Sequence, residues 1–209
     1  HMKKFFKMIF PIFIIVTLFC ACSENETLDM GTFVERYNKN SNVSLSFSDI
    51  IGTEKENGEE YSFTTVLNDD GGKKILTKLF ANESKKLYEC RIVAAKGSGK
   101  NKSAFSAEER ERFFFAVLSL FRAFSGLGEE KANSVLLQLG LDKEETFLKS
   151  GERTIQSDEY YLISLSNDVA FEVIIYNTWL KKIEETEKPE SKPLFEETTK
   201  IRTETVPHK

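Results

Sequence analysis

Residues Ser106 to Gly126 read SAEERERFFFAVLSLFRAFSG, and this stretch predicts a long, buried helix over residues 107–124. Ser106 and Glu109 have the S-x-x-E spacing of a capping box, in which each side chain binds the backbone N–H of the other residue at a helix start. Gly126 ends the pattern, because glycine readily adopts the left-handed conformation that follows a helix. Apolar residues lie almost all around this helix, which indicates burial on more than one side; a partner-binding face is the alternative. The phenylalanines concerned are Phe113, Phe114, Phe115, Phe121 and Phe124.

Strands are expected on both sides of this helix, since short runs rich in β-branched and aromatic residues lie there between turn-forming residues. Before the helix, the predicted strands cover residues 43–48, 61–67, 74–81 and 87–95. After it, they cover residues 146–149, 154–156, 160–165 and 169–176. Two further helices are predicted, one over residues 28–40 with Thr27 as its cap and one over residues 129–139.

The order helix, strands, helix, strands predicts an α+β fold, with an antiparallel sheet packed by helices on one face. We place it in a single domain over residues 27–182. Duplication of a helix-plus-sheet unit would give the same order, which in element order alone resembles TATA-box-binding-protein-like and cystatin-like architectures. Residues 183–209 are rich in Glu, Lys, Thr and Pro. Too few apolar side chains remain there to offset the entropy cost of folding, so we expect a charged, disordered tail.

The first 21 residues have the pattern of a secretory signal peptide. Lysines at positions 3, 4 and 7 form a basic start, residues 8–19 form an apolar stretch, and the chain becomes polar from Ser23. A membrane-spanning helix needs about 20 apolar residues. The stretch has only 12, which favours a cleaved signal over a retained membrane anchor.

The end of this segment, Leu18-Phe19-Cys20-Ala21-Cys22, resembles the lipobox of bacterial lipoproteins. In that family a small residue precedes the cysteine that is lipidated after cleavage, and Ala21 before Cys22 fits the pattern, whereas the bulky Phe19 before Cys20 does not. Phe19 also stands where the family usually has an aliphatic residue, so ordinary secretion stays an alternative. The resemblance implies acyl chains such as palmitate on Cys22, a tether over residues 22–26, and a location on the extracytoplasmic side of a bacterial membrane.

The charge of the chain argues against a nucleic-acid partner. The 209 residues include 29 basic and 33 acidic ones, and the segment 1–21 contains three of the lysines and no acidic residue. Its removal leaves 26 basic and 33 acidic residues, a net charge of −7. Phosphate backbones and anionic lipid surfaces repel an acidic body, so we expect membrane contact through the lipid alone.

Few residues are suited to catalysis or metal binding. The two histidines, His1 and His208, lie at the chain ends, so we predict no histidine-based catalytic or zinc site. Residues 97–100 lack the spacing of a nucleotide-binding loop, and we predict no cofactor. Cys90 has no internal histidine to activate it, so a buried thiol is expected. Adjacent acids that could serve a hydrolase are Glu108–Glu109, Glu129–Glu130, Glu144–Glu145 and Asp158–Glu159.

The sequence therefore favours a non-catalytic binding or interaction domain at the cell envelope, with an unidentified envelope protein or ligand as its partner. Aromatic side chains provide large contacts at low entropy cost, so Tyr160, Tyr161 and Trp179 form the candidate binding surface. Two alternatives stay open. One is a carrier with an apolar cavity between the helix over 107–124 and the sheet, and the other is a carboxylate-dependent hydrolase.

Overall fold

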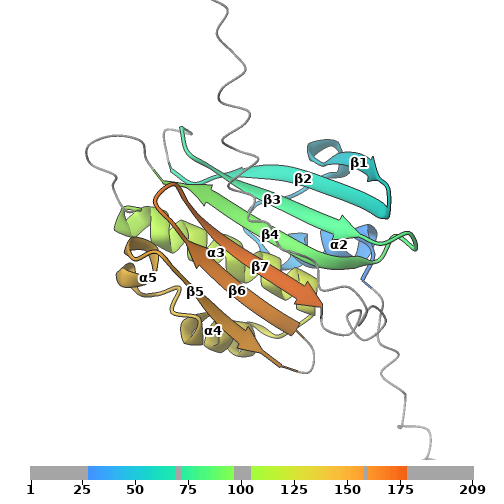
Figure 1. Cartoon of the computed structure of the whole chain (residues 1–209). Helices are drawn as coiled ribbons and strands as arrows, with labels where there is room; N and C mark the ends of the chain where they lie inside the picture. The colour runs from blue at the N-terminus through green and yellow to red at the C-terminus, as the bar shows by residue number, and fades with distance from the viewer. Residues whose placement is uncertain (1–27, 69–71, 97–104, 158–159, 178–209) are drawn as a thin grey trace, which may run out of the picture.

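A computed structural model of the chain describes residues 28–68, 72–96, 105–157 and 160–177 (Figure 1). Within these ranges helices cover one face of a seven-stranded antiparallel sheet, which confirms the predicted α+β fold. The helices are α2 (Met30–Asn40), α3 (Ala107–Ser125), α4 (Glu129–Gln138) and α5 (Glu144–Leu148). The strands are β1 (Ile51–Lys55), β2 (Gly58–Val66), β3 (Lys74–Ala81), β4 (Leu87–Ala95), β5 (Gly151–Gln156), β6 (Tyr160–Ser166) and β7 (Ala170–Asn177).

The predicted long helix forms as α3, with the predicted caps. Ser106 Oγ accepts a hydrogen bond from the Glu109 N–H at 3.1 Å, and Glu109 Oε2 accepts one from the Ser106 N–H at 2.9 Å. The other oxygen of Glu109 lies 2.7 Å from Lys73 Nζ, which ties the helix start to the turn between β2 and β3. Gly126 ends the helix with a φ of 73°, a conformation that is costly for residues with a side chain.

The sheet consists of two meanders that meet in its middle. Its strand order is β1-β2-β3-β4-β7-β6-β5, and each neighbouring pair is antiparallel. The last strands of the two meanders, β4 and β7, pair with each other, and a helix precedes each meander. A duplicated helix-plus-sheet unit would produce this arrangement; the duplication itself stays a prediction.

Aromatic rings fill the space between α3 and the sheet. Between ring centroids, Phe113 of α3 lies 5.5 Å from Phe171 of β7 and 6.1 Å from Phe147 of α5. Phe147 in turn lies 4.4 Å from Phe171, and all three side chains are fully buried. α2 covers the first meander in a similar way, through a 6.1 Å contact between the rings of Tyr37 and Phe63.

The prediction of a strand over residues 43–48 is wrong. Asn38 of α2 binds the backbone of Leu45 twice, at 2.7 Å to its N–H and 2.9 Å to its carbonyl oxygen, and so occupies groups that a strand would pair. Ser46 then begins a short 3-10 turn, η1 (Phe47–Asp49). The edge strand β1, which the sequence did not predict, forms directly after this turn.

The prediction of a strand over residues 146–149 is also wrong, because most of this segment lies in the short helix α5. Glu144 and Glu145 occupy the first turn of that helix, where its dipole favours acidic side chains. The helical turn also brings Phe147 into the core, where its ring meets that of Phe113. Tertiary packing therefore decides the local conformation here.

The helix α2 begins later than the sequence predicts. Asp29 caps it, since its Oδ1 accepts a hydrogen bond from the Thr32 N–H at 2.8 Å. Thr27, the predicted cap, lies outside the described residues.

Several predicted segments lie outside the described residues. They are the signal peptide 1–21, the tether 22–26, the last residues of the domain predicted over 27–182, and the tail 183–209. In the described part of the chain, no helix has both the length and the apolar character to cross a membrane.

Candidate functional site

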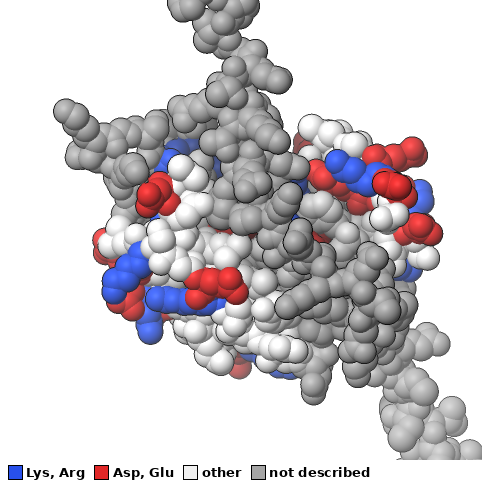
Figure 2. All heavy atoms as spheres, in the orientation of Figure 1, with Lys and Arg blue, Asp and Glu red and all other residues white. Residues whose placement is uncertain are grey.

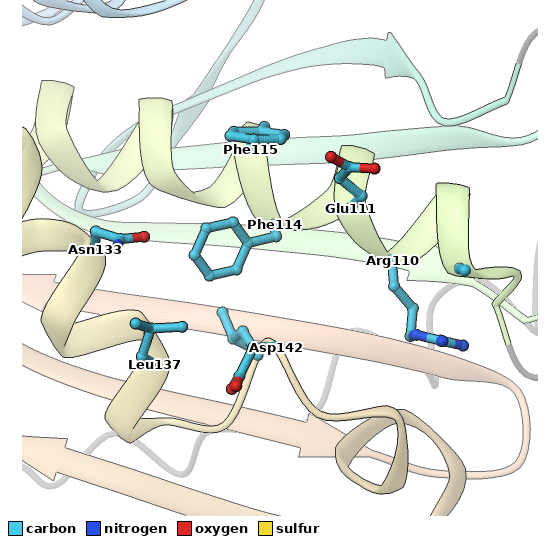
Figure 3. Close-up of a pocket in the computed structure, with 9 residues that line it drawn as sticks. Arg110, Glu111, Phe114, Phe115, Asn133, Leu137 and Asp142 are labelled. Atoms are coloured by element: carbon cyan, nitrogen blue, oxygen red, sulfur yellow. The ribbon is translucent and has the colours of Figure 1, made fainter.

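An open groove of about 320 Å³ lies between α3 and α4 (Figure 3). Consecutive residues of a helix point about 100° apart, so the three adjacent phenylalanines of α3 divide between core and groove. Phe113 is in the core, Phe114 points between the two helices, and Phe115 lies on the outer side of α3 with 56% of its surface exposed. Leu137 of α4 faces Phe114 and is 41% exposed. Exposed apolar side chains that line one groove are typical of a binding surface.

The rim of this groove is polar. Arg110 is already engaged, because its guanidinium donates to the Phe105 carbonyl oxygen at 2.8 Å and lies 3.3 Å from the Glu144 carboxylate. Glu111 and Asp142 line the groove and are exposed, which gives the rim negative charge. The groove therefore suits an apolar side chain that has a basic residue beside it.

A second surface lies on the opposite face of the sheet, which we call the helix-free face because none of the described helices packs on it. Its central residues are Glu89, Arg91 and Val93 of β4, Glu172, Ile174 and Tyr176 of β7, and Tyr161 and Ile163 of β6. Figure 1 looks onto this face, with the sheet in front of the helices.

Acidic and basic side chains are intermixed at the outer strands of this face (Figure 2). Glu60 of β2 lies between two lysines, 3.3 Å from Lys55 of β1 and 3.0 Å from Lys78 of β3. The charges of these strands therefore neutralise one another locally, and the outer strands present no large patch of one sign.

Arg91 is the centre of the helix-free face. Its guanidinium pairs with Glu89 of the same strand, and its Cζ lies 5.5 Å from the centroid of the Phe80 ring. Beside this pair, the rings of Tyr161 and Tyr176 stack with their centroids 6.0 Å apart. Arginine and aromatic side chains are enriched where one polypeptide segment packs on another.

Burial sets the protonation of this face. It raises the pKa of Glu89, and the charge of Arg91 opposes that shift. Burial lowers the pKa of Arg91, but the charges of Glu89 and Glu172 outweigh this effect, so the guanidinium stays charged. Burial and the Glu89 charge raise the pKa of Tyr176 to about 12. Arg91 is therefore a fixed positive charge close to two carboxylates.

The two acidic residues at the centre of this face start from distant backbone positions, and both interact with Arg91. Glu89 is opposite Tyr176 and Glu172 is opposite Val93, four positions further along β4. That offset separates the two α-carbons by about 13 Å along the strands. Arg91 also lies between them in the register.

The structure does not gather the acidic pairs predicted from the sequence into one cleft. Glu109 is used in the α3 capping box, and the other described members are exposed at the starts of helices α3, α4 and α5. Asp158 and Glu159 lie outside the described residues. These acids are therefore explained by the helix dipole, which favours negative charge at a helix start.

The structure separates the tyrosines of the predicted binding surface. Tyr160 is buried under α3, with its ring edge-on to Phe121 at 5.1 Å. Tyr161 is on the helix-free face, because successive residues of a strand point to opposite sides. Trp179 and the lipidation candidate Cys22 lie outside the described residues. Of the two described residues of the predicted surface, Tyr161 alone belongs to a face that is free of described helices.

Among the described residues, no three His, Cys, Asp or Glu side chains are grouped as a metal site requires. Cys90 is buried, as predicted, and burial raises its pKa. The reactive thiolate form is therefore disfavoured at this position.

Sequence reasoning missed the cluster around Arg91 and the role of Leu137. The sequence does contain a signal for the Arg91 cluster. Glu172 interrupts an otherwise apolar strand, and Glu89 and Arg91 alternate with buried residues of β4. The groove had no local signal, because it needs residues of two helices and their packing. Comparison with known proteins identifies no relative, since no family model, no curated protein and no solved structure matches this chain.

Proposed function

We propose that this chain is a bacterial lipoprotein, held by acyl chains on Cys22 at the extracytoplasmic side of the membrane, whose folded domain binds a partner protein without catalysing a reaction. The observation that carries the binding function is the groove between α3 and α4, where Phe115 and Leu137 are 56% and 41% exposed. Apolar surface of this kind is costly to leave in water, and a partner would cover it.

The point at which the chain enters the described domain supports this proposal. The described part begins at Leu28, whose carbonyl oxygen accepts a hydrogen bond from the Leu87 N–H at 2.8 Å, so it is fixed at the start of β4. Residues 22–27 reach about 20 Å when extended. The end of the sheet where β4 begins would therefore face the membrane.

The groove lies toward the other end of the sheet. β4 has nine residues and so spans about 30 Å. The first half of α3 lies over its far end, because Phe113 packs on Phe171, the residue opposite Ala94. The first half of α3 also lines the groove. A domain moored through Cys22 would therefore present the groove away from the bilayer.

The packing favours binding over the two alternatives. A carrier needs an apolar cavity between α3 and the sheet, and the rings of Phe113, Phe147 and Phe171 occupy that space. A carboxylate-dependent hydrolase needs two acids together in a cleft. Glu89 and Glu172 both interact with Arg91, and the other described candidate acids are distributed over three helix starts.

The chemistry of the groove specifies the kind of partner. Phe114 and Leu137 would accept an aliphatic or aromatic side chain, and the carboxylates of Glu111 and Asp142 would attract a lysine or arginine beside it. A protein segment of that composition is the partner we propose.

Site-specific photo-crosslinking in the source cells tests this proposal. A benzophenone amino acid is placed at position 115 in the groove or, as the control, at position 66, where Val66 is 54% exposed on β2. We expect a crosslinked partner from position 115 only, and its loss in the Leu137→Asp variant. Equal crosslinking from both positions, or a partner that Leu137→Asp leaves unchanged, would contradict the proposal.

A further inference from the structure

Residues at the centre of the helix-free face are buried as deeply as the core. Ile174 is 1% exposed and Glu172 is 0% exposed, and both point away from α3 and the other described helices. Ile163 and Tyr176 beside them are buried as well. A sheet face without a covering layer would leave such side chains open to water.

The burial is confined to the middle of that face. On the same side, Thr64 and Val66 of β2 are exposed, and so are Glu152 and Thr154 of β5. What covers the face is therefore narrow, and it lies over β4, β7 and β6. A second full domain would have covered the outer strands too.

We infer that the C-terminal segment, residues 178–209, packs over the centre of the helix-free face, in place of the disordered tail that its composition alone predicts over residues 183–209. The inference rests on the proposed function in one respect, since it takes residues 1–21 to be removed from the mature protein. The other undescribed segments of the mature chain, residues 22–27, 69–71, 97–104 and 158–159, are two to eight residues long and so offer far less covering surface than the C-terminal segment. The segment 178–209 has 32 residues, enough to cross a sheet of this size several times.

The starting point and the composition of the segment fit this role. It follows directly on Asn177, the last residue of β7, and β7 itself contributes Glu172, Ile174 and Tyr176 to the face. Its apolar side chains can meet Ile163 and Ile174, and its glutamates can approach Arg91. The apolar residues in question are Trp179, Leu180, Ile183, Leu194, Phe195, Ile201 and Val206.

Such a cover would make Arg91 and its carboxylates a recognition site for the segment. Arg91 keeps its charge although it is largely buried, and a buried charge is costly unless the groups around it are arranged to hold it. Release of the segment would expose Ile163, Ile174, Tyr161 and Tyr176 together, a second apolar surface on the side of the sheet away from the groove.

Thiol labelling of the soluble chain 23–209 tests the inference. The Ile174→Cys variant carries the probe under the proposed cover, and the Thr64→Cys variant carries it on the exposed part of the same face. Cys90 is buried in both and reports any unfolding by becoming reactive. We expect Ile174→Cys to react at least about tenfold more slowly than Thr64→Cys, because reaction requires local opening.

A protease site inserted after Asn177 then allows the segment to be cut from a chain that has already folded. After cutting and gel filtration, the labelling rate of Ile174→Cys should rise to that of Thr64→Cys, while Cys90 stays unlabelled. A cut segment that stays with the domain through gel filtration also supports the inference.

Equal labelling rates of the two variants in the intact chain, or a slow rate of Ile174→Cys that persists after the segment is gone, would overturn the inference. A slow rate that disappears on dilution would assign the cover to a second copy instead. Acylation of Cys22 has no part in this assay. A negative labelling result would therefore count against the C-terminal cover and not against the proposed lipoprotein function.

Discussion

The carbonyl oxygen of Leu28 accepts a hydrogen bond from the backbone N–H of Leu87, with 2.8 Å between the two atoms. This contact joins the first described residue to the start of a central strand of the sheet. Leu28 is itself buried, so the chain enters the domain at a fixed point. If acyl chains hold Cys22, the turn between β3 and β4 is kept near the bilayer.

This arrangement predicts how the anchored domain is oriented. A fluorophore attached at exposed Glu83, in the β3–β4 turn, should be quenched by spin-labelled lipid headgroups when the acylated protein is on vesicles. A fluorophore at exposed Glu108, at the start of α3, should be quenched much less. Equal quenching at the two positions would show that the domain has no preferred orientation.

Two phenylalanines of α3 that are two positions apart should differ sharply in their effect on stability. Phe113 is fully buried among the rings of Phe147 and Phe171, so Phe113→Ala should lower the free energy of unfolding by about 3–5 kcal/mol. Phe115 is 56% exposed, so Phe115→Ala should change it by no more than about 0.5 kcal/mol. Chemical denaturation of both variants measures the difference, and similar losses would show that α3 does not pack as described.

The N-cap of α2 should give a pH-dependent contribution to stability. The hydrogen bond from the Thr32 N–H lowers the pKa of Asp29 below its ordinary 3.8. The folded state therefore favours the charged carboxylate, and its contribution is present above pH 3.8 and is lost as the pH falls through the lowered pKa. Asp29→Ala should cost about 1 kcal/mol at neutral pH. Asp29→Asn, which keeps a capping oxygen, should cost less, and urea denaturation between pH 2 and 7 distinguishes the two.

The contribution of Glu89 to folding stability should depend on pH in the opposite direction to that of Asp29. Burial raises its pKa above the ordinary 4.5 in spite of Arg91, so the folded state favours the neutral form relative to the unfolded chain. Its contribution to stability is present below pH 4.5 and is lost as the pH rises through the raised pKa. Glu89→Gln should therefore gain stability relative to the wild type over that interval. Glu83→Gln, in an exposed turn, is the control, and a parallel pH profile for Glu89→Gln and the wild type would contradict this account.

The sequence predicted those elements whose signals are local. The capping box of Ser106 and Glu109 and the stop at Gly126 located α3, because these contacts join residues only a few positions apart. The alternation of residues 43–48 and the short apolar run within residues 146–149 predict strands, but Asn38 and the core around Phe147 override these local preferences. Local propensity does not include such long-range partners.

The candidate sites depended even more on tertiary structure. The groove needs Phe114 of α3 and Leu137 of α4 side by side, and the sequence does not give the angle between two helices. Tyr160 and Tyr161 appeared as one surface in the sequence, yet strand geometry sends them to opposite faces. Arg91 gains its importance from Phe80 and Glu172, which lie on the two neighbouring strands.

The central claim is that Cys22 carries the lipid that moors this binding domain, and intact-mass analysis of the membrane fraction tests it most directly. We expect the wild-type chain to begin at Cys22 with the added mass of its acyl chains, and the Cys22→Ala variant to lack that mass and to leave the membrane fraction. A wild-type chain that is cleaved without acyl addition, or not cleaved at all, would contradict the account.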